Sequence, residues 1–349
     1  MSVNQLRRDP ISGEWIIILQ DEGNVEAFLS QKSLRKQGSE QVSSGPCAFC
    51  GGHEAETPPE IFAIRPDQTG KNEPGWSVRV IPNQQPVLQI YGELNNRGVG
   101  LYDVLDGIGA HELVIETPEH HQQLHDMQLD QIQLVLAAYR ERILDLKQDS
   151  RFRYVLVHKN HGEAEDATRD HSHSHIIATP ITPARVKAEL MNAMAHYQYK
   201  ERCLFCDIVG QELDDQERIV AENDRYVALA PFASRSPFET WVLPQDHEPF
   251  FETNAEFGQL ADILKRVLVK LNTTLGRPSF VMVLHSGPNL AAGKERGYWK
   301  TLERDYHWHI EITPRFRGYT SFAIGSGFQI NAVPPEKAAE LLAQVEVSV

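Results

Sequence analysis

The chain has 349 residues, a formal net charge of −14 at pH 7 and an ordinary apolar fraction of 41%. This length suits two domains or one large one, and the acidic balance argues against nucleic acid or an anionic membrane face as a partner. Apolar runs are too short to span a bilayer, and the first residues have no secretory pattern, so we expect a cytoplasmic protein.

The first half of the chain predicts several strands and one long helix. A turn at 9–14 precedes a strand at 15–19, and a polar loop over 31–46 leads to Cys47 and Cys50. Apolar runs and helically spaced apolar residues then predict strands at 76–82, 111–116 and 152–158 and a helix at 129–146.

A short stretch of alternating histidines and serines follows these elements. His171, His173 and His175 alternate with Ser172 and Ser174 and run into Ile-Ile-Ala. In a strand the three imidazoles share one face, because alternate side chains point the same way. So many adjacent rings would repel if charged, so we expect them to be neutral, metal-bound or paired with anions. The alternative is a histidine-rich surface loop.

The second half repeats this order. A second Cys-x-x-Cys pair comes first, and the remaining elements follow in the same sequence: Cys203 and Cys206, strands at 226–230 and 238–247, a helical stripe at 257–271, a strand at 279–285 and His-Trp-His at 307–309. The repetition predicts an internal duplication whose two sheets are joined. We place the units at 1–196 and 197–349, within an α+β fold with a mixed, mostly antiparallel sheet and flanking helices.

Two residue sets are candidate metal ligands. Two thiolates and two imidazoles suit tetrahedral zinc: Cys47, Cys50, His120 and His171. A redox-active cysteine pair is the competing interpretation. One carboxylate and three imidazoles suit zinc or Fe(II): Glu189, His285, His307 and His309. His285 taken alone is equally consistent with a buried core histidine, and Cys203 and Cys206 carry no metal prediction.

Several of these motifs together resemble one enzyme family. They are the Cys-x-x-Cys, Glu-Thr-Pro-Glu-His at 116–120, Asn160 ahead of the histidine stretch, Leu-His-Ser-Gly-Pro at 284–288 and His-Trp-His. In this order the chain resembles galactose-1-phosphate uridylyltransferase, of the histidine-triad superfamily. The resemblance covers nearly the whole chain and implies two fused histidine-triad units and a homodimer.

The resemblance also implies residue roles. His173 matches the nucleophile of the family, Asn83 and Asn160 match asparagines that contact the nucleotide, and the two metal sets match a zinc site and a second, structural metal site. A neutral imidazole is a good nucleophile near pH 7, and a covalent intermediate divides one transfer into two easier steps. Zinc on His171 would stiffen the strand that aims His173.

The sequence departs from the family pattern at four places. His175 stands in place of Gln, 20–23 lack the arginine pair for the substrate diphosphate, 164–169 lack a Gly-Ala-Ser-like stretch, and Gly325-Ser-Gly lacks the Tyr-Glu pair for the hexose. Thr168 and Arg169 remain candidate phosphate contacts. Gln329 is a candidate substrate contact within 325–331, which resembles the divergent bacterial branch and plant-type ADP-glucose phosphorylase.

The expected function is nucleotidyl transfer through a covalent nucleotidyl-His173 intermediate. The leading expectation is UDP-glucose:hexose-1-phosphate uridylyl transfer in galactose metabolism. The alternatives are an ADP-sugar or dinucleoside-polyphosphate phosphorylase or hydrolase, and a nucleotide- or metal-binding protein without turnover. For His175 we expect a catalytic role, in which a cationic or proton-shuttling ring lets the intermediate leak to water. The alternative is a neutral, hydrogen-bonded ring that packs beneath the strand.

Overall fold

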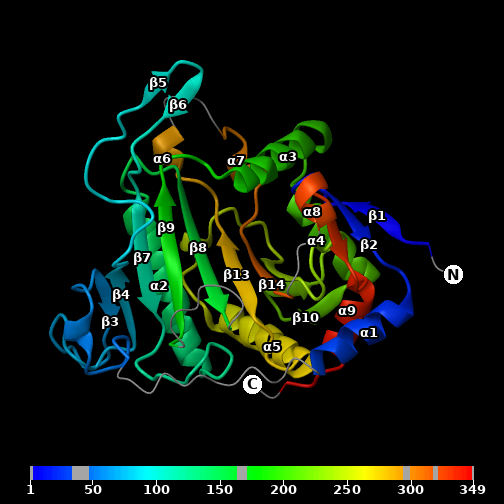
Figure 1. Cartoon of the computed structure of the whole chain (residues 1–349), viewed down its shortest axis with the longest axis horizontal. Helices are drawn as coiled ribbons and strands as arrows, with labels where there is room; N and C mark the ends of the chain where they lie inside the picture. Colours follow the sequence, from blue (N-terminus) through cyan, green and yellow to red (C-terminus); the bar gives the residue numbers. More distant parts are fainter. Residues whose placement is uncertain (1–2, 34–46, 163–170, 294–298, 317–320, 348–349) are drawn as a thin grey trace.

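The computed structural model describes residues 3–33, 47–162, 171–293, 299–316 and 321–347 (Figure 1). Most of its strands belong to one sheet of ten, in the order β10-β11-β12-β14-β13-β8-β9-β7-β4-β3. Neighbouring strands pair antiparallel throughout this sheet. The α+β fold with a mostly antiparallel sheet is therefore confirmed, and the mixed character comes from a smaller sheet described below.

The first-half unit contributes five strands and the helix α2. Their bounds are β3 Phe62–Ile64, β4 Val78–Pro82, β7 Ala110–Ile115, α2 Leu129–Leu146, β8 Tyr154–His161 and β9 His173–Thr179. The helix forms where the apolar stripe predicts it, and its buried face carries Ile132, Leu136, Tyr139 and Ile143. The last strand is the histidine stretch, which is therefore a strand from His173 onward.

The second-half unit has the same elements in the same spatial order. They are β10 Ile219–Glu222, β11 Tyr226–Leu229, β12 Thr240–Pro244, α5 Gly258–Leu275, β13 Phe280–His285 and β14 His309–Pro314. In each unit the last strand in sequence lies between the third and the fourth. The units join where β13 pairs with β8, for example Val281 opposite Asn160. One joined sheet built from two equal halves is the arrangement that the repeated motifs predict.

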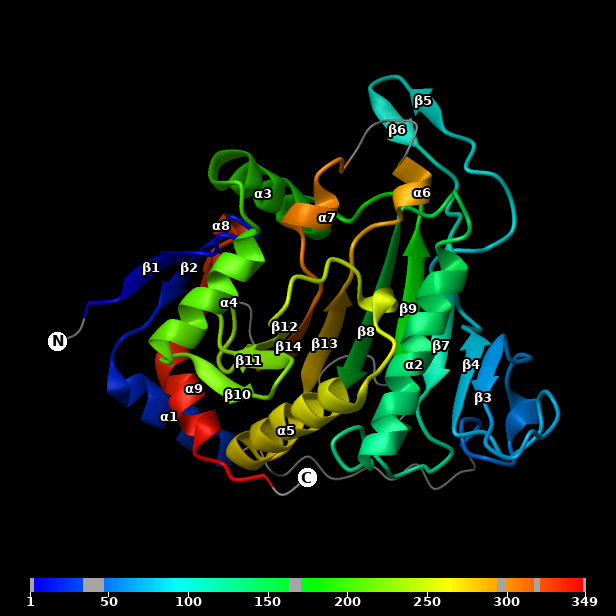
Figure 2. The same cartoon turned by 180° about the vertical axis from the view of Figure 1, so that it is seen from behind.

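Helices cover one face of the sheet along its whole width. Figure 2 shows α2 and α5 lying across that face, and their apolar side chains pack with those of both units in one large core. On the opposite face of the first unit, Phe49 and Trp76 pack on Ile81, Leu113 and Ile115. In the second unit this face is covered by helices. There α3 (Ala184–Lys200) and α4 (Leu204–Asp215) pack on Val227, Leu229 and Trp241. The same face of the first unit carries His173 and His175.

The remaining elements lie around this sheet. A small sheet joins β1 (Gln5–Arg8) and β2 (Trp15–Ile18) to β15 (Gln329–Asn331), which runs parallel to β2. A hairpin, β5 (Arg97–Val99) and β6 (Tyr102–Val104), projects beyond the main sheet (Figure 1). The helices still unnamed are α1 Glu22–Ser33, η1 Glu54–Glu56, η2 Phe251–Thr253, α6 Leu290–Gly293, α7 Leu302–Asp305, α8 Ser321–Ser326 and α9 Pro335–Ala343.

The first strands of the chain lie with the second unit, because β2 pairs with β15 there. The helix α3 runs through the expected unit boundary near 195–202, so the boundary at 196/197 stays a prediction. Among the described residues, no helix has the length and apolarity to cross a membrane.

Candidate active site

His173 begins β9 and has one nitrogen committed to the main chain. Its Nδ1 lies 2.7 Å from the carbonyl oxygen of His171, which can only accept a hydrogen bond and so fixes Nδ1 as the donor. The lone pair is then on Nε2. The ring packs edge-on against Phe49, with centroids 5.5 Å apart, and the residue is partly exposed. In its neutral form the ring therefore offers Nε2 as the nucleophilic nitrogen.

A buried polar network holds this strand from the opposite face. Ser172 and Ser174 point to that face, where both hydroxyls donate to the carboxylate of Glu116. Tyr139 on α2 donates to the same carboxylate at 3.0 Å. Lys159 Nζ lies 2.7 Å from Glu116 Oε2 and 3.0 Å from Ser172 Oγ. The Glu116 and Lys159 side chains are almost fully buried, and the charges are compensated by each other and by the three hydroxyls.

Lys159 also replaces a missing part of the strand ladder. The pairing of β8 with β9 ends at His158 opposite His175, two residues before the nucleophile His173. Beyond that point Lys159 Nζ donates to the main-chain oxygen of His173 at 3.1 Å. Although burial raises it, Lys159 and the two serines hold the pKa of Glu116 below its ordinary value. The network therefore carries full charges that fix the nucleophile's backbone.

His175 lies in a cluster of uncharged rings. It stacks on His158 with ring centroids 4.9 Å apart and planes 8° apart, and its Nδ1 lies 3.0 Å from Nε2 of His111. Burial, and then the neighbouring rings of His158 and His173, lower the pKa of His175 to about 3. Burial lowers the pKa of His158 to about 4. The cationic form of His175 expected near pH 7 is therefore disfavoured, because burial desolvates the ring and its neighbours within the described residues are other imidazoles.

Four predicted ligands meet as a metal site. Cys50 Sγ lies 3.5 Å from Nδ1 of His120 and 3.7 Å from Nδ1 of His171, and Cys47 Sγ lies 3.7 Å from the latter. Tetrahedral zinc with ordinary bond lengths gives sulfur–nitrogen edges of about 3.6 Å. Nε2 of His171 donates to the Thr117 carbonyl oxygen at 2.7 Å, which leaves Nδ1 for a metal. The residues fit a zinc ion.

A second Cys/His cluster occupies the equivalent place in the second unit. Its members are Cys203, Cys206, His247 and His307, whose ligand atoms lie within 4.8 Å of one another. His247 Nε2 and His307 Nε2 donate to the main-chain oxygens of Glu303 and Pro244, so both Nδ1 atoms face the thiols. This arrangement repeats the first site, including the carbonyl partner of the last histidine. It also fits a tetrahedral metal.

The expected ligand set around Glu189 is corrected by this geometry. His307 does not join it, because alternation along the strand and the Pro244 carbonyl turn its ring to Cys206, 3.7 Å away. Glu311 takes its place in a fully buried cluster: Glu189, His285, His309 and Glu311. The Glu311 carboxylate already accepts from Arg185 and Arg235, and the rings of His285 and His309 stack in parallel 4.6 Å apart. This cluster fits a metal less well than the two Cys/His sites.

The residues predicted to bind substrate lie in different parts of the structure. Asn83 follows β4 and contacts the ring of His111, and Asn160 lies on β8 on the same face as His158 by alternation. Thr168 and Arg169 lie outside the described residues. Gln329 begins β15, whose partner β2 lies on the far side of the molecule from β9 (Figure 1). The structure therefore does not bring Gln329 to the histidines of its own chain.

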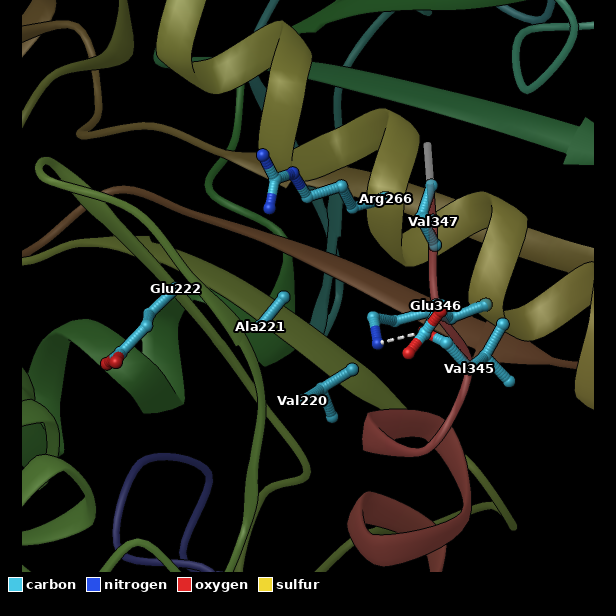
Figure 3. A pocket seen from close by; sticks show the side chains of 8 residues that line it. Val220, Ala221, Glu222, Arg266, Val345, Glu346 and Val347 are labelled. Carbon is cyan, nitrogen blue, oxygen red and sulfur yellow. Dashed lines mark hydrogen bonds between the residues drawn. The ribbon is translucent and has the colours of Figure 1, made fainter. Parts of the chain in front are cut away.

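A pocket of about 440 Å³ lies away from these residues, between β10, α5 and the chain's C-terminal segment (Figure 3). Its Lys270 donates to the main-chain oxygens of Leu342, Ala343 and Val345 at 2.7 to 3.2 Å. The ammonium caps the end of α9, where the last carbonyls of a helix need donors. We assign the pocket a structural role.

Comparison with known proteins identifies the family to which this fold belongs. Residues 84–183 match the model of the galactose-1-phosphate uridyl transferase N-terminal domain, and residues 189–346 match that of its C-terminal domain. ADP-glucose phosphorylase of Arabidopsis thaliana is 30% identical over 348 residues, 99% of this chain and 93% of that protein. The chain belongs to the galactose-1-phosphate uridylyltransferase family.

Further relatives of this family place the chain in a divergent branch. Galactose-1-phosphate uridylyltransferase of Thermotoga maritima is 25% identical, over 99% of both chains. The structure of ADP-glucose phosphorylase from A. thaliana with bound ADP-glucose superposes with a TM-score of 0.80 at 28% identity, covering 99% of this chain and 100% of that one. A uridylyltransferase structure superposes with a TM-score of 0.72 at 26% identity, covering 98% of this chain and 97% of that one.

Proposed function

We propose that the protein is a nucleotidyltransferase that uses a nucleotidyl-His173 intermediate, with an ADP-sugar as donor and inorganic phosphate as acceptor. The observation that carries the chemistry is the bond from Nδ1 of His173 to the His171 carbonyl, which leaves Nε2 as a nucleophile. The similarity to ADP-glucose phosphorylase supports the choice of donor and acceptor. The uridylyltransferase reaction becomes the second candidate, supported by the relative that spans both chains at 25% identity.

In the first step the lone pair of Nε2 attacks the α-phosphorus. A nitrogen–phosphorus bond forms, and the bond from that phosphorus to the bridging oxygen breaks, so a sugar 1-phosphate leaves with the electron pair. The ring of His173 becomes cationic, since both of its nitrogens are now substituted. The His171 carbonyl oxygen then accepts a charge-assisted hydrogen bond from Nδ1, which stabilises that charge.

In the second step a phosphate oxygen attacks the same phosphorus. The new oxygen–phosphorus bond forms, the nitrogen–phosphorus bond breaks, and its electron pair returns to Nε2, which releases a nucleoside diphosphate. The two steps use one nucleophile and need the ring in one orientation throughout. Lys159 and Glu116 maintain it by fixing the backbone of His173.

Cys47, Cys50, His120 and His171 would hold a zinc ion beside this strand. A bound divalent cation supplies the charge that keeps both thiols deprotonated and joins the cysteine knuckle to β9. Without such a charge, burial and then the neighbouring Cys47 thiol raise the pKa of Cys50 to about 11. The metal is therefore proposed as a structural clamp for the active strand, and the phosphoryl chemistry is left to the side chains.

Product analysis tests the proposed reaction. The zinc-loaded protein is incubated with ADP-glucose or UDP-glucose, each with phosphate or galactose 1-phosphate, and nucleotides are separated by chromatography. We expect ADP and glucose 1-phosphate from ADP-glucose with phosphate. Preferential formation of UDP-galactose would support the second candidate, and an absence of turnover in all four mixtures would contradict both.

A further inference from the structure

A chain of hydrogen bonds runs from the main chain of the loop after β4 to the ring of His175. The main-chain N–H of Val87 donates to Nδ1 of His111 at 3.2 Å. Nε2 of His111 in turn lies 3.0 Å from Nδ1 of His175. His111 stands on β7 opposite Ile177, so the strand pairing places its ring beside that of His175. The three groups come from three separate segments of the first unit.

This chain fixes the position of each proton. A neutral imidazole has one donor and one acceptor nitrogen, and a main-chain N–H can only donate. Nδ1 of His111 must therefore accept, and its proton lies on Nε2. That Nε2–H donates to Nδ1 of His175, so the proton of His175 lies on its own Nε2. A protonated His111 would place two N–H groups against each other, and burial lowers its pKa in the same sense.

Asn83 does not compete for either lone pair of His111. Its Nδ2 is 3.1 Å from Nε2 and 3.4 Å from Nδ1 of that ring, and an atom so close to both nitrogens lies over the ring face. Its Oδ1 accepts from the main-chain N–H of Gln85 at 3.0 Å, which fixes the orientation of the amide. On its other side His175 stacks on His158, so its plane is also held.

We propose that His111 is a positioning residue that holds His175 in its Nε2–H tautomer, so that His175 presents a fixed, uncharged N–H donor to the phosphoryl oxygens at His173. The proposal rests on the proposed function, since a phosphoryl group must be present to accept this bond. The ring of His175 is suitably placed, with its centroid 5.3 Å from that of His173. An uncharged donor of this kind is what a glutamine amide supplies, and it does not change with pH near neutrality.

The tautomer is measured without substrate by long-range 1H–15N NMR of the holoenzyme labelled at histidine. His175→Gln identifies the His175 signals. His53→Gln is the matched control, because the side chain of His53 is partly exposed and pairs with Glu56, away from the hydrogen bonds between Val87, His111 and His175. We expect a bare Nδ1 and a protonated Nε2 for His175 in the wild type and in His111→Gln, whose amide can still donate. His111→Phe should show both tautomers. A proton on Nδ1 of His175 in the wild type would overturn the proposal.

The second measurement is the rate at which ADP-glucose forms the nucleotidyl-enzyme, which tests whether His111 acts through His175. His111→Phe should slow it about five- to tenfold, the worth of one neutral hydrogen bond, and His111→Gln about twofold or less. In a His175→Gln background His111→Phe should have no further effect, because the glutamine donor needs no tautomer control. An equal loss in both backgrounds would show a merely structural role and overturn the proposal. If NMR shows the expected tautomers but no nucleotidyl adduct forms on any variant or on the wild type, the proposed function is contradicted and the tautomer assignment still stands.

Discussion

Replacing Lys159 by Met tests the network behind the nucleophile. The ammonium of Lys159 is the only full positive charge that contacts the Glu116 carboxylate within the described residues, and these side chains are 2% and 0% exposed. Removing one partner of a buried pair costs about 3–5 kcal/mol, because the other charge stays buried. The three hydroxyls that donate to Glu116 offset part of this cost. We therefore expect a loss near the lower limit, about 3 kcal/mol.

Urea unfolding of the zinc-loaded protein at pH 7, followed by circular dichroism, measures this loss. The matched control is the double variant Glu116→Gln/Lys159→Met, which removes both charges and keeps an amide for the hydroxyls. It should lie within about 1 kcal/mol of the wild type, since a neutral replacement of a buried pair is often nearly neutral. A single variant as stable as the wild type, or a double variant less stable than the single one, would refute the reasoning.

The pH dependence of the loss has a definite sign. In the wild type the lowered pKa of Glu116 stabilises the fold above the unfolded value of about 4.3, and this contribution is lost as pH falls through the folded pKa. Without Lys159 the folded pKa rises, so the carboxyl becomes neutral at higher pH. The difference between variant and wild type should therefore shrink from pH 8 toward pH 5. A constant difference over this range would mean that Glu116 is not the charged partner.

Three other predictions concern the metals and the substrate face. Metal analysis should find about two ions per chain, with about one fewer in either Cys47→Ser or Cys203→Ser, as expected for four-ligand sites; unchanged content in Cys203→Ser would rule out the second site. His175→Gln should keep the rate of adduct formation within about threefold and should not lengthen the life of the adduct, because both side chains donate one neutral hydrogen bond; slower hydrolysis of the adduct would favour a proton-shuttling His175. Asn160→Ala should slow adduct formation about tenfold at an unchanged melting temperature, for loss of one substrate hydrogen bond; an unchanged rate would remove Asn160 from the site.

The duplicated sheet could be predicted from the sequence because its strands and helices have strong local patterns. The apolar stripe over 129–146 and the alternation after His171 both correspond to elements with nearly the same bounds in the structure. Short edge elements were not predicted. The strand β10 has only four residues, and the hairpin β5–β6 has mostly exposed side chains, so neither leaves an apolar pattern.

Only those parts of the site whose residues lie in recognisable sequence motifs could be predicted from the sequence. The repeat itself relates His307 to His171 and His247 to His120, so the second Cys/His cluster could have been predicted from the duplication alone. The assignment of His307 to the Glu189 set follows the resemblance instead. By contrast, Glu116 and Lys159 stand 43 residues apart. Glu116 begins the Glu-Thr-Pro-Glu-His motif without a predicted role of its own, and Lys159 belongs to none of the motifs. Their contact depends on β8 and β7 both flanking β9, which is a property of the sheet order.

The central claim is that His173 carries the nucleotidyl group. Its most direct test is intact-mass spectrometry of the zinc-loaded protein after incubation with ADP-glucose in the absence of phosphate, followed by peptide mapping. We predict an adduct with the mass of one adenylyl group, located on His173, that disappears with release of ADP when phosphate is added. His173→Ala should form no adduct while keeping its metal content and fold. Turnover retained in His173→Ala, or an adduct mapped to another residue, would contradict the account.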